Sequence, residues 1–367
     1  MPYYPNQTLI IGLTTIRRER RLPPGAIGQA AAREASHVEA QDIVLQGALP
    51  GEFIMLDALR PLGLRRPEQF NETMLTVQPG NTVERWQVIA QNGSRTLKAP
   101  RAALLAHVED GQIVLQTDPE PIDIYALCPG EITSVRGAEE VLLETVGALI
   151  QGVWGNGKRT FSAYKMEPQN GIDTLASDDD TTFSEYKGSA IILTHPIAST
   201  AVFDIAKKQE MTAIVAPSMS SDLRATALRQ NIPIILTSGF GDQQMSELVY
   251  NLLRDNLGRP AMFDATEPER WSPSRPEIVI PLPTGGQLPP PPETDAPLVE
   301  GALVRLTRAP YAGMSGRIRR LVETPRSVEN GLRLPGAEVQ VAGGRTVFVP
   351  LANIELLGRS GETAGIG

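Results

Sequence analysis

A glycine-rich stretch is the first place in the sequence where residue types and spacing could support chemistry. Residues 152–158 read GVWGNGK, which matches the start of the phosphate-loop pattern: two glycines separated by four residues, then a lysine. Such a loop holds phosphates with its backbone amides and lysine, and a following hydroxyl side chain binds Mg²⁺. Here Arg159 occupies the hydroxyl position, and residues 160–164 predict a strand instead of a helix. The sequence therefore favours a β-turn over a nucleotide site.

Other reactive side chains lack the partners that catalysis requires. The single cysteine, Cys128, has no histidine at a catalytic spacing and excludes an intramolecular disulfide. The three histidines are far apart in the sequence. Residues 178–180, three aspartates in a Ser/Thr-rich stretch, predict a solvated loop that could hold a cation only weakly. We therefore expect no metal site and no cofactor, name no catalytic residue, and favour a binding protein over an enzyme.

Hydroxyl groups and glycines follow three strongly apolar stretches, residues 189–194, 212–216 and 232–237. Helical patterns alternate with these stretches, which predicts a parallel sheet whose ligands bind beyond the carboxyl ends of the strands. The alternative is that the same residues only cap helices and form tight turns. The candidate pocket for a small polar ligand comprises Thr194, His195, Ser218, Ser220, Ser238, Gly239 and Gly241.

Arginines are concentrated near the C-terminus. Residues 299–358 contain eight arginines, no lysine and five glutamates, which leaves a charge of +3 in a chain whose net charge is −8. Arginine binds phosphate with a planar fork of donors and also stacks on bases. The alternative is that these arginines only form the solvent-exposed face of a barrel. The candidate nucleic-acid or partner contact comprises Arg305, Arg308, Tyr311, Arg317, Arg319 and Arg320.

Length and composition indicate a multidomain α+β protein. The chain has 367 residues, enough for two or three domains, and its hydrophobic content of 41% excludes a wholly disordered chain. The net charge of −8 argues against the whole chain coating nucleic acid or an anionic membrane. Turn residues and apolar runs divide the chain into a β-rich N-terminal segment (1–65), a barrel-sandwich-like β domain (66–168), an α/β domain (187–267), a Pro-rich linker (268–298), an SH3-like β-barrel (299–358) and a disordered tail (359–367).

Three stretches of the N-terminal half resemble the lipoyl/biotinyl-type barrel-sandwich hybrid family. They are VQPGNTVERWQVIA (77–90), KAPRAALLAHVEDGQIVL (98–115) and ALCPGEITSV (126–135). Carrier members of that family hold their cofactor on a lysine in a Met-Lys-Met or Asp-Lys turn. Lys98 stands in Thr-Leu-Lys-Ala-Pro, which lacks that signature. The resemblance therefore implies the fold and not the carrier function.

Residues 194–215 loosely resemble the phosphohistidine swivelling domain of phosphoenolpyruvate-utilising enzymes. In that family a Ser-His pair opens the helix, whereas this chain has Ser199-Thr200 there and places His195 upstream, before a proline. The resemblance implies a small swivelling-type α/β domain.

The C-terminal arginines lie in a stretch that resembles the KOW motif of NusG-like transcription factors and several ribosomal proteins. The motif is carried by GALVRLTR (301–308) and PYAGMSGRI (310–318), and residues 338–341, 346–350 and 353–357 fit the later strands. The resemblance implies an SH3-like barrel, a bacterial source, and a partner that is RNA, the ribosome or a transcription-complex protein.

We therefore predict a non-enzymatic cytoplasmic adaptor whose KOW-like module is tethered by the Pro-rich linker. One alternative is a small polar-ligand-binding or phosphotransfer-like protein that acts at the α/β strand ends. A second alternative is a structural assembly subunit that packs against copies of itself as a homo-oligomer. The cytoplasmic location rests on the N-terminus, where the apolar run 9–13 precedes its positive charges, and on the lack of about 18 apolar residues without charge.

Overall fold

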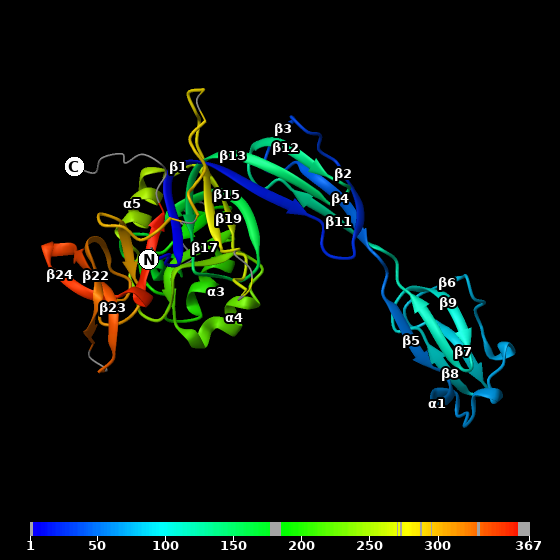
Figure 1. Cartoon of the computed structure of the whole chain (residues 1–367). Coiled ribbons are helices and arrows are strands. Elements are labelled where there is room, and N and C mark those ends of the chain that lie inside the picture. The colour runs from blue at the N-terminus through cyan, green and yellow to red at the C-terminus, as the bar shows by residue number, and fades with distance from the viewer. Residues whose placement is uncertain are drawn as a thin grey trace.

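The computed structural model describes residues 3–176, 185–269, 271, 274–286, 288–294, 296–328 and 331–358 (Figure 1). Strands dominate the described part, helices are few, and the main sheet mixes parallel and antiparallel pairs. The aspartates at 178–180 and the tail at 359–367 lie outside the described residues. No helix of the described part is both long and apolar enough to cross a bilayer.

Two long antiparallel strands form the centre of the structure. Strand β1 (Gln7–Arg21) pairs with β13 (Glu140–Gln151) along most of its length, and both run through a 16-stranded sheet. One end of this pair packs against a small sheet, which forms what we call the middle unit. Its further strands are β2 (Ile27–Ala30), β3 (His37–Val38), β4 (Ile43–Leu49), β11 (Glu120–Tyr125) and β12 (Gly130–Arg136). Buried Val44 and Leu45 of β4 pack against Ile16, Ile132 and Leu143 in the core between the layers.

A second small β structure, the distal unit, is inserted between β4 and β11. These two strands pair as far as Leu49 opposite Glu120, after which the chain runs out into the distal unit and returns (Figure 1). The unit has its own core, which includes Leu62, Ile89, Leu105 and Ile113. Its elements are β5 (Phe53–Asp57), α1 (Leu59–Leu62), η1 (Pro67–Gln69), η2 (Glu72–Met74), β6 (Thr82–Val83), β7 (Val88–Asn92), β8 (Arg95–Lys98), β9 (Ala103–Glu109) and β10 (Gln112–Gln116).

This insertion departs from the expected division at residues 65 and 66. Strand β5 lies before that boundary and pairs with β10 after it, so residues 1–65 do not form a separate segment. Of the three stretches that resemble the barrel-sandwich family, 77–90 and 98–115 lie in the distal unit and 126–135 lies in the middle unit. The turn residues near 50 and 118 did not distinguish the ends of an insertion from ordinary hairpin turns.

The α/β unit confirms the three predicted parallel strands. Strands β16 (Ala190–Ile192), β17 (Ala213–Met219) and β18 (Ile234–Phe240) pair in parallel. Helix α3 (Ala201–Lys208) packs on one face of them and helix α5 (Glu247–Asp255) on the other. The unit also contains β14 (Trp154–Gly155), β15 (Arg159–Met166), η3 (Ile172–Ala176), η4 (Ser221–Leu223), α4 (Arg224–Leu228), β19 (Pro260–Asp264) and β20 (Glu277–Pro281).

The glycine-rich stretch at 152–158 lies around β14 and leads directly into strand β15. Gly157 has a positive φ of 82°, and its amide donates to the carbonyl oxygen of Ala265 at 2.6 Å. A strand therefore follows this stretch, as the sequence predicted, and the helix N-terminus of a phosphate loop is missing from it.

The C-terminal unit is five strands with a short helical turn before the last. Its elements are β21 (Leu303–Leu306), β22 (Ser315–Ser327), β23 (Arg333–Val341), η5 (Ala342–Gly344), β24 (Thr346–Pro350), η6 (Leu351–Asn353) and β25 (Ile354–Gly358). Alternate residues of these strands, among them Val304, Ile318, Val339 and Leu356, form its core.

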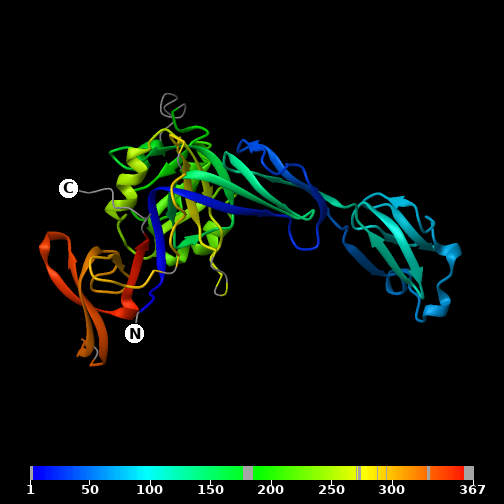
Figure 2. The same cartoon turned by 45° about the horizontal axis from the view of Figure 1, so that its top comes forward.

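This unit is fixed to the rest of the chain and is not held by a free tether. Strand β25 pairs in parallel with β1, where Gln7 lies opposite Leu356, so the N-terminal end of β1 lies beside the C-terminal unit (Figure 2). The proline run is also held: the hydroxyl of Thr14 donates to the carbonyl oxygen of Pro290 at 2.8 Å, and that of Thr15 to Pro289 at 2.5 Å. The proline run is therefore held against β1, a contact that the sequence did not predict because the side chains that bind these carbonyls come from a strand far away in sequence.

We predict that the distal unit can be removed without unfolding the remainder. A variant in which residues 50–119 are replaced by Asn-Gly would join paired Leu49 and Glu120 by a two-residue hairpin turn. Because the distal core shares none of the described core residues of the other units, thermal unfolding of the shortened chain should stay cooperative. Circular dichroism melting checks this, and loss of the cooperative transition would contradict an independent insertion.

Candidate functional site

The C-terminal unit is joined to the α/β unit by a buried ion pair. Arg305 on β21 lies directly opposite Glu355 on β25, and both side chains are 8% exposed. The guanidinium of Arg305 donates to Glu355 Oε2 through Nε at 2.9 Å and Nη2 at 2.5 Å. Its Nη1 donates to the carbonyl oxygen of Thr237 at 2.8 Å, in the middle of β18. One arginine therefore connects the two units.

The second oxygen of the same carboxylate binds two other parts of the chain. Oε1 of Glu355 accepts a hydrogen bond from the hydroxyl of Thr8 on β1 and another from Arg275 Nη1 at 3.1 Å. Arg275 Nη1 also donates to the Thr8 hydroxyl at 2.9 Å. Burial by itself raises the pKa of Glu355, but the charge of Arg305, hydrogen bonds from Thr8 and Arg305, and the charge of Arg275 together lower the pKa below its ordinary value. Glu355 is therefore a buried anion at neutral pH.

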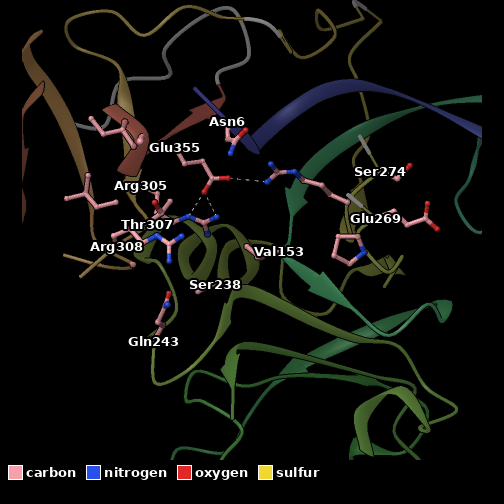
Figure 3. A pocket seen from close by; sticks show the side chains of 16 residues that line it. Asn6, Val153, Ser238, Gln243, Glu269, Ser274, Arg305, Thr307, Arg308 and Glu355 are labelled. Carbon is pink, nitrogen blue, oxygen red and sulfur yellow. Dashed lines mark hydrogen bonds and ion pairs between the residues drawn. The ribbon is translucent and has the colours of Figure 1, made fainter. Parts of the chain in front are cut away.

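A cavity of about 680 Å³ opens beside this network, between the α/β unit, the C-terminal unit and the segment before β20 (Figure 3). We call it the junction cavity. Its volume lies within the range of small-molecule sites, about 300–1,000 Å³. The lining residues include Asn6, Ser238, Gln243, Glu269, Ser274, Arg275, Arg305, Thr307, Arg308 and Glu355.

The junction cavity brings together residues from both candidate sets. Ser238 belongs to the predicted strand-end pocket, and Arg305 and Arg308 belong to the predicted contact edge. Arg308 is exposed and, within the described residues, its side chain forms no hydrogen bond or ion pair. Glu355, Arg275 and Gln243 were missed, because they meet only where segments that are remote in sequence come together.

The other strand-end residues do not form one pocket. Thr194 and His195 gather around Glu167: the amide of Thr194 donates to Oε1 at 2.8 Å, and His195 Nδ1 lies 2.9 Å from it. The imidazole of His195 is 74% exposed. Within the described residues, no group of three or more His, Cys, Asp or Glu side chains could hold a metal ion here.

Ser218 and the glycines at the end of β18 shape a loop. The buried hydroxyl of Ser218 lies 2.9 Å from the carbonyl oxygens of Gly241 and Gln243, and it accepts from the Gln243 amide at 2.9 Å. Gly239 and Gly241 have positive φ values of 98° and 116°, which favour glycine. Ser220 precedes η4 and forms no side-chain cap. Here the alternative of turns and loop contacts describes the residues better than a pocket.

The predicted arginine edge is also divided. Arg305 is buried and unable to contact a partner, whereas Arg317, Arg319 and Arg320 are exposed on β22. Arg320 pairs with Glu338 at 3.0 Å, and Arg317 donates to the carbonyl oxygen of Gly301 at 3.3 Å. Glu338 has a lowered pKa because of its hydrogen bonds from arginines, chiefly Arg320. One carboxylate therefore offsets part of the positive charge of this face.

A groove on the C-terminal unit is lined by two aromatic side chains, Tyr311 and Phe348. It has a volume of about 560 Å³ and is lined by Arg308, Ala309, Pro310, Tyr311, Ser327, Val328, Leu334, Phe348, Val349, Pro350 and Asn353. We call it the aromatic groove. The guanidinium of Arg345 lies 5.5 Å from the ring centre of Tyr311, and that of Arg326 lies 5.3 Å from the ring of Phe348. None of the described residues that line the groove is Asp or Glu.

Phe348 was not among the predicted contact residues. It lies on β24 opposite Glu338 of β23, a register that only strand pairing reveals. The usable signal was the alternation of residues 346–350, which places Phe348 on the face opposite buried Val347 and Val349.

The single cysteine is not a nucleophile. Cys128 is 1% exposed in the core of the middle unit. Burial raises the pKa of its thiol to about 11, so the thiol is protonated at neutral pH.

We predict that Glu355→Gln destabilises the protein by about 3 kcal/mol at neutral pH, because Arg305 is left as an unpaired buried charge. A carboxylate whose pKa is lowered on folding stabilises the folded state above its unfolded pKa, and this contribution is lost as the pH falls through the folded pKa. We therefore expect the free energy of unfolding, measured by chemical denaturation, to fall from neutral to acid pH in the wild-type chain. The fall should be smaller in Glu355→Gln.

Glu338→Gln is the matched control, since Glu338 also pairs with two arginines but lies on an accessible face. We expect a smaller loss for this variant. Equal losses in the two variants would contradict a special cost of leaving Arg305 unpaired in the interior.

Comparisons with known proteins assign neither a family nor a function to the chain. No protein-family model matches the chain, and no curated protein sequence matches it significantly. A function is therefore inferred from the two sites themselves, the junction cavity and the aromatic groove.

Proposed function

We propose that the protein is a non-enzymatic adaptor whose C-terminal unit binds single-stranded RNA in the aromatic groove. The observation that carries the proposal is the groove itself: two aromatic rings and Arg308 line it, and no described lining residue is acidic. Single-stranded nucleic acid is bound by grooves in which cations follow the backbone and aromatic rings stack with bases.

The strand arrangement supports this proposal. The five strands pair in the order β25-β21-β22-β23-β24, and η6 precedes the last strand, an arrangement consistent with the SH3-like barrel that the KOW resemblance implies. Members of that family include RNA-binding and ribosomal proteins. We therefore propose that the C-terminal unit is a KOW-like barrel.

Charge around the groove also supports an anionic partner. Arg345 covers one face of Tyr311, and Arg326 covers one face of Phe348. Arg326 also pairs with Glu338 at 2.9 Å, so Arg308 and Arg345 supply most of the uncompensated charge. A base could stack beside either ring while these two guanidiniums contact the neighbouring phosphates.

The fixed position of the unit gives the adaptor its geometry. Pairing of β25 with β1 and the Arg305–Glu355 ion pair hold the groove on the body of the protein. The distal unit lies at the opposite end of the molecule (Figure 1). RNA bound at one end would therefore be held at a set distance from any partner bound by the distal unit.

We predict that Tyr311→Leu and Phe348→Leu each weaken the binding of a labelled, mixed-sequence single-stranded RNA about tenfold, since one base stack contributes roughly 1–3 kcal/mol. Arg308→Ala should weaken binding and reduce the slope of log K against log salt by about 0.7, the contribution of one phosphate contact. Fluorescence anisotropy at several salt concentrations measures both effects.

The matched control is Arg317→Ala/Arg319→Ala, which removes two exposed arginines of the same unit that do not line the groove. A larger loss for this double variant than for the aromatic variants would place the contact on the β22 face and contradict the groove. If RNA does not bind and the groove variants lose a nuclease-resistant protein partner instead, the RNA proposal is wrong.

A further inference from the structure

The junction cavity has a rigid frame. The carboxylate of Glu355 binds Thr8 on β1, Arg275 in the segment before β20, and Arg305 on β21. Both its oxygens are occupied, and its side chain is 8% exposed. These contacts fix three of the chain segments around the cavity in one arrangement, so a ligand would meet a preformed site.

The charge of the cavity wall is positive. Two guanidiniums, those of Arg275 and Arg305, share the single carboxylate of Glu355, which leaves one positive charge. Arg308 adds a second, and it forms no hydrogen bond or ion pair within the described residues. Glu269 is the other carboxylate among the described lining residues, and it lies across the cavity from Arg308 (Figure 3). Three guanidiniums therefore face two carboxylates, which leaves a net charge of +1.

Neutral polar side chains lie on the same side as Arg308. Ser238, Gln243 and Thr307 line the cavity there (Figure 3). The hydroxyl of Ser238 forms no hydrogen bond within the described residues, so it can bind a ligand without breaking an internal contact. The hydrogen bonds of Arg275 to Thr8 and Glu355 both use Nη1, so they do not involve its Nε and Nη2.

We propose that the junction cavity binds a small phosphorylated metabolite that also carries hydroxyl groups. Arg308 and Arg275 bind the phosphate, because charge-assisted hydrogen bonds from guanidiniums are strong and directional. Ser238, Gln243 and Thr307 bind the hydroxyl groups. The net positive charge of the lining favours an anion over a cation, and the polar lining favours a polar ligand over an apolar one.

Arg308 gives this site a regulatory consequence, which rests on the proposed function. The same side chain lines the aromatic groove as well as the junction cavity. A phosphate in the cavity and a phosphate of RNA in the groove would therefore compete for one guanidinium. The metabolite would weaken RNA binding without entering the groove.

The direct test is isothermal titration calorimetry of the full chain with AMP, glucose 6-phosphate, inorganic phosphate and glucose. We expect at least one of the two phosphorylated metabolites to bind more tightly than inorganic phosphate, and glucose not to bind. Arg308→Ala and Ser238→Ala should each weaken that binding, the arginine variant by about tenfold. Arg319→Ala removes an exposed arginine of the same unit outside the cavity and should leave the affinity unchanged.

Several results would overturn the site. They are no binding of either metabolite at millimolar concentration, affinity no higher than that of inorganic phosphate, or equal loss in Arg319→Ala. Phe348→Leu separates the two proposals, because Phe348 lines the aromatic groove and does not line the junction cavity. If this variant loses RNA and keeps the metabolite, both proposals hold. Metabolite binding in a chain that binds no RNA would support the cavity and refute the proposed function.

Competition tests the regulatory consequence. Saturating metabolite should weaken RNA binding by wild-type protein several-fold and leave the residual RNA binding of Arg308→Ala unchanged. RNA affinity that does not respond to a metabolite shown to bind would refute the coupling.

Discussion

The architecture depends on how one buried carboxylate is satisfied. An isolated ionised group in a protein interior is strongly unfavourable, so Glu355 requires several donors at once. It finds them on three segments, through Thr8, Arg275 and Arg305, and Arg305 extends the contact to the carbonyl of Thr237. With β25, which carries Glu355 itself, five regions of the chain must therefore be in place together. Buried ion pairs often contribute little net stability, and the best-supported role of this one is to specify how the units join.

Strand β1 makes that joining possible because it pairs first with β25 and then with β13 along its length. Its first residues, Gln7 to Leu9, pair in parallel with β25, and the remainder pairs with β13. The register with β13 shifts between Ile11 and Thr14, where the strand changes direction locally. The same region presents the hydroxyls of Thr14 and Thr15 to the proline run. A segment with linker composition is thereby held against a strand, and the C-terminal unit cannot move as a tethered module.

The sequence predicted features whose signals are local and could not predict those that arise from long-range pairing. The parallel strands β16, β17 and β18 were found because each is a continuous apolar run followed by a helical pattern. The insertion of the distal unit was not found, because pairing of Leu49 with Glu120 leaves no mark in either residue's neighbourhood. Arg305 shows the same limit within a site: its type and spacing match those of the exposed arginines, and only its position opposite Glu355 makes it structural.

The two sites share a boundary because Arg308 lies in the loop that joins β21 to β22. Arg305 and Arg308 are three residues apart, yet the first is buried and paired while the second is exposed and has no side-chain partner among the described residues. The buried arginine fixes the backbone from which the exposed one extends, and Arg308 lines both the junction cavity and the aromatic groove. Under our proposal, a phosphate bound on one side would lower the positive potential offered to the other, since a single charge cannot be fully used twice. The proposed coupling requires no change of fold, because the two sites share one exposed side chain.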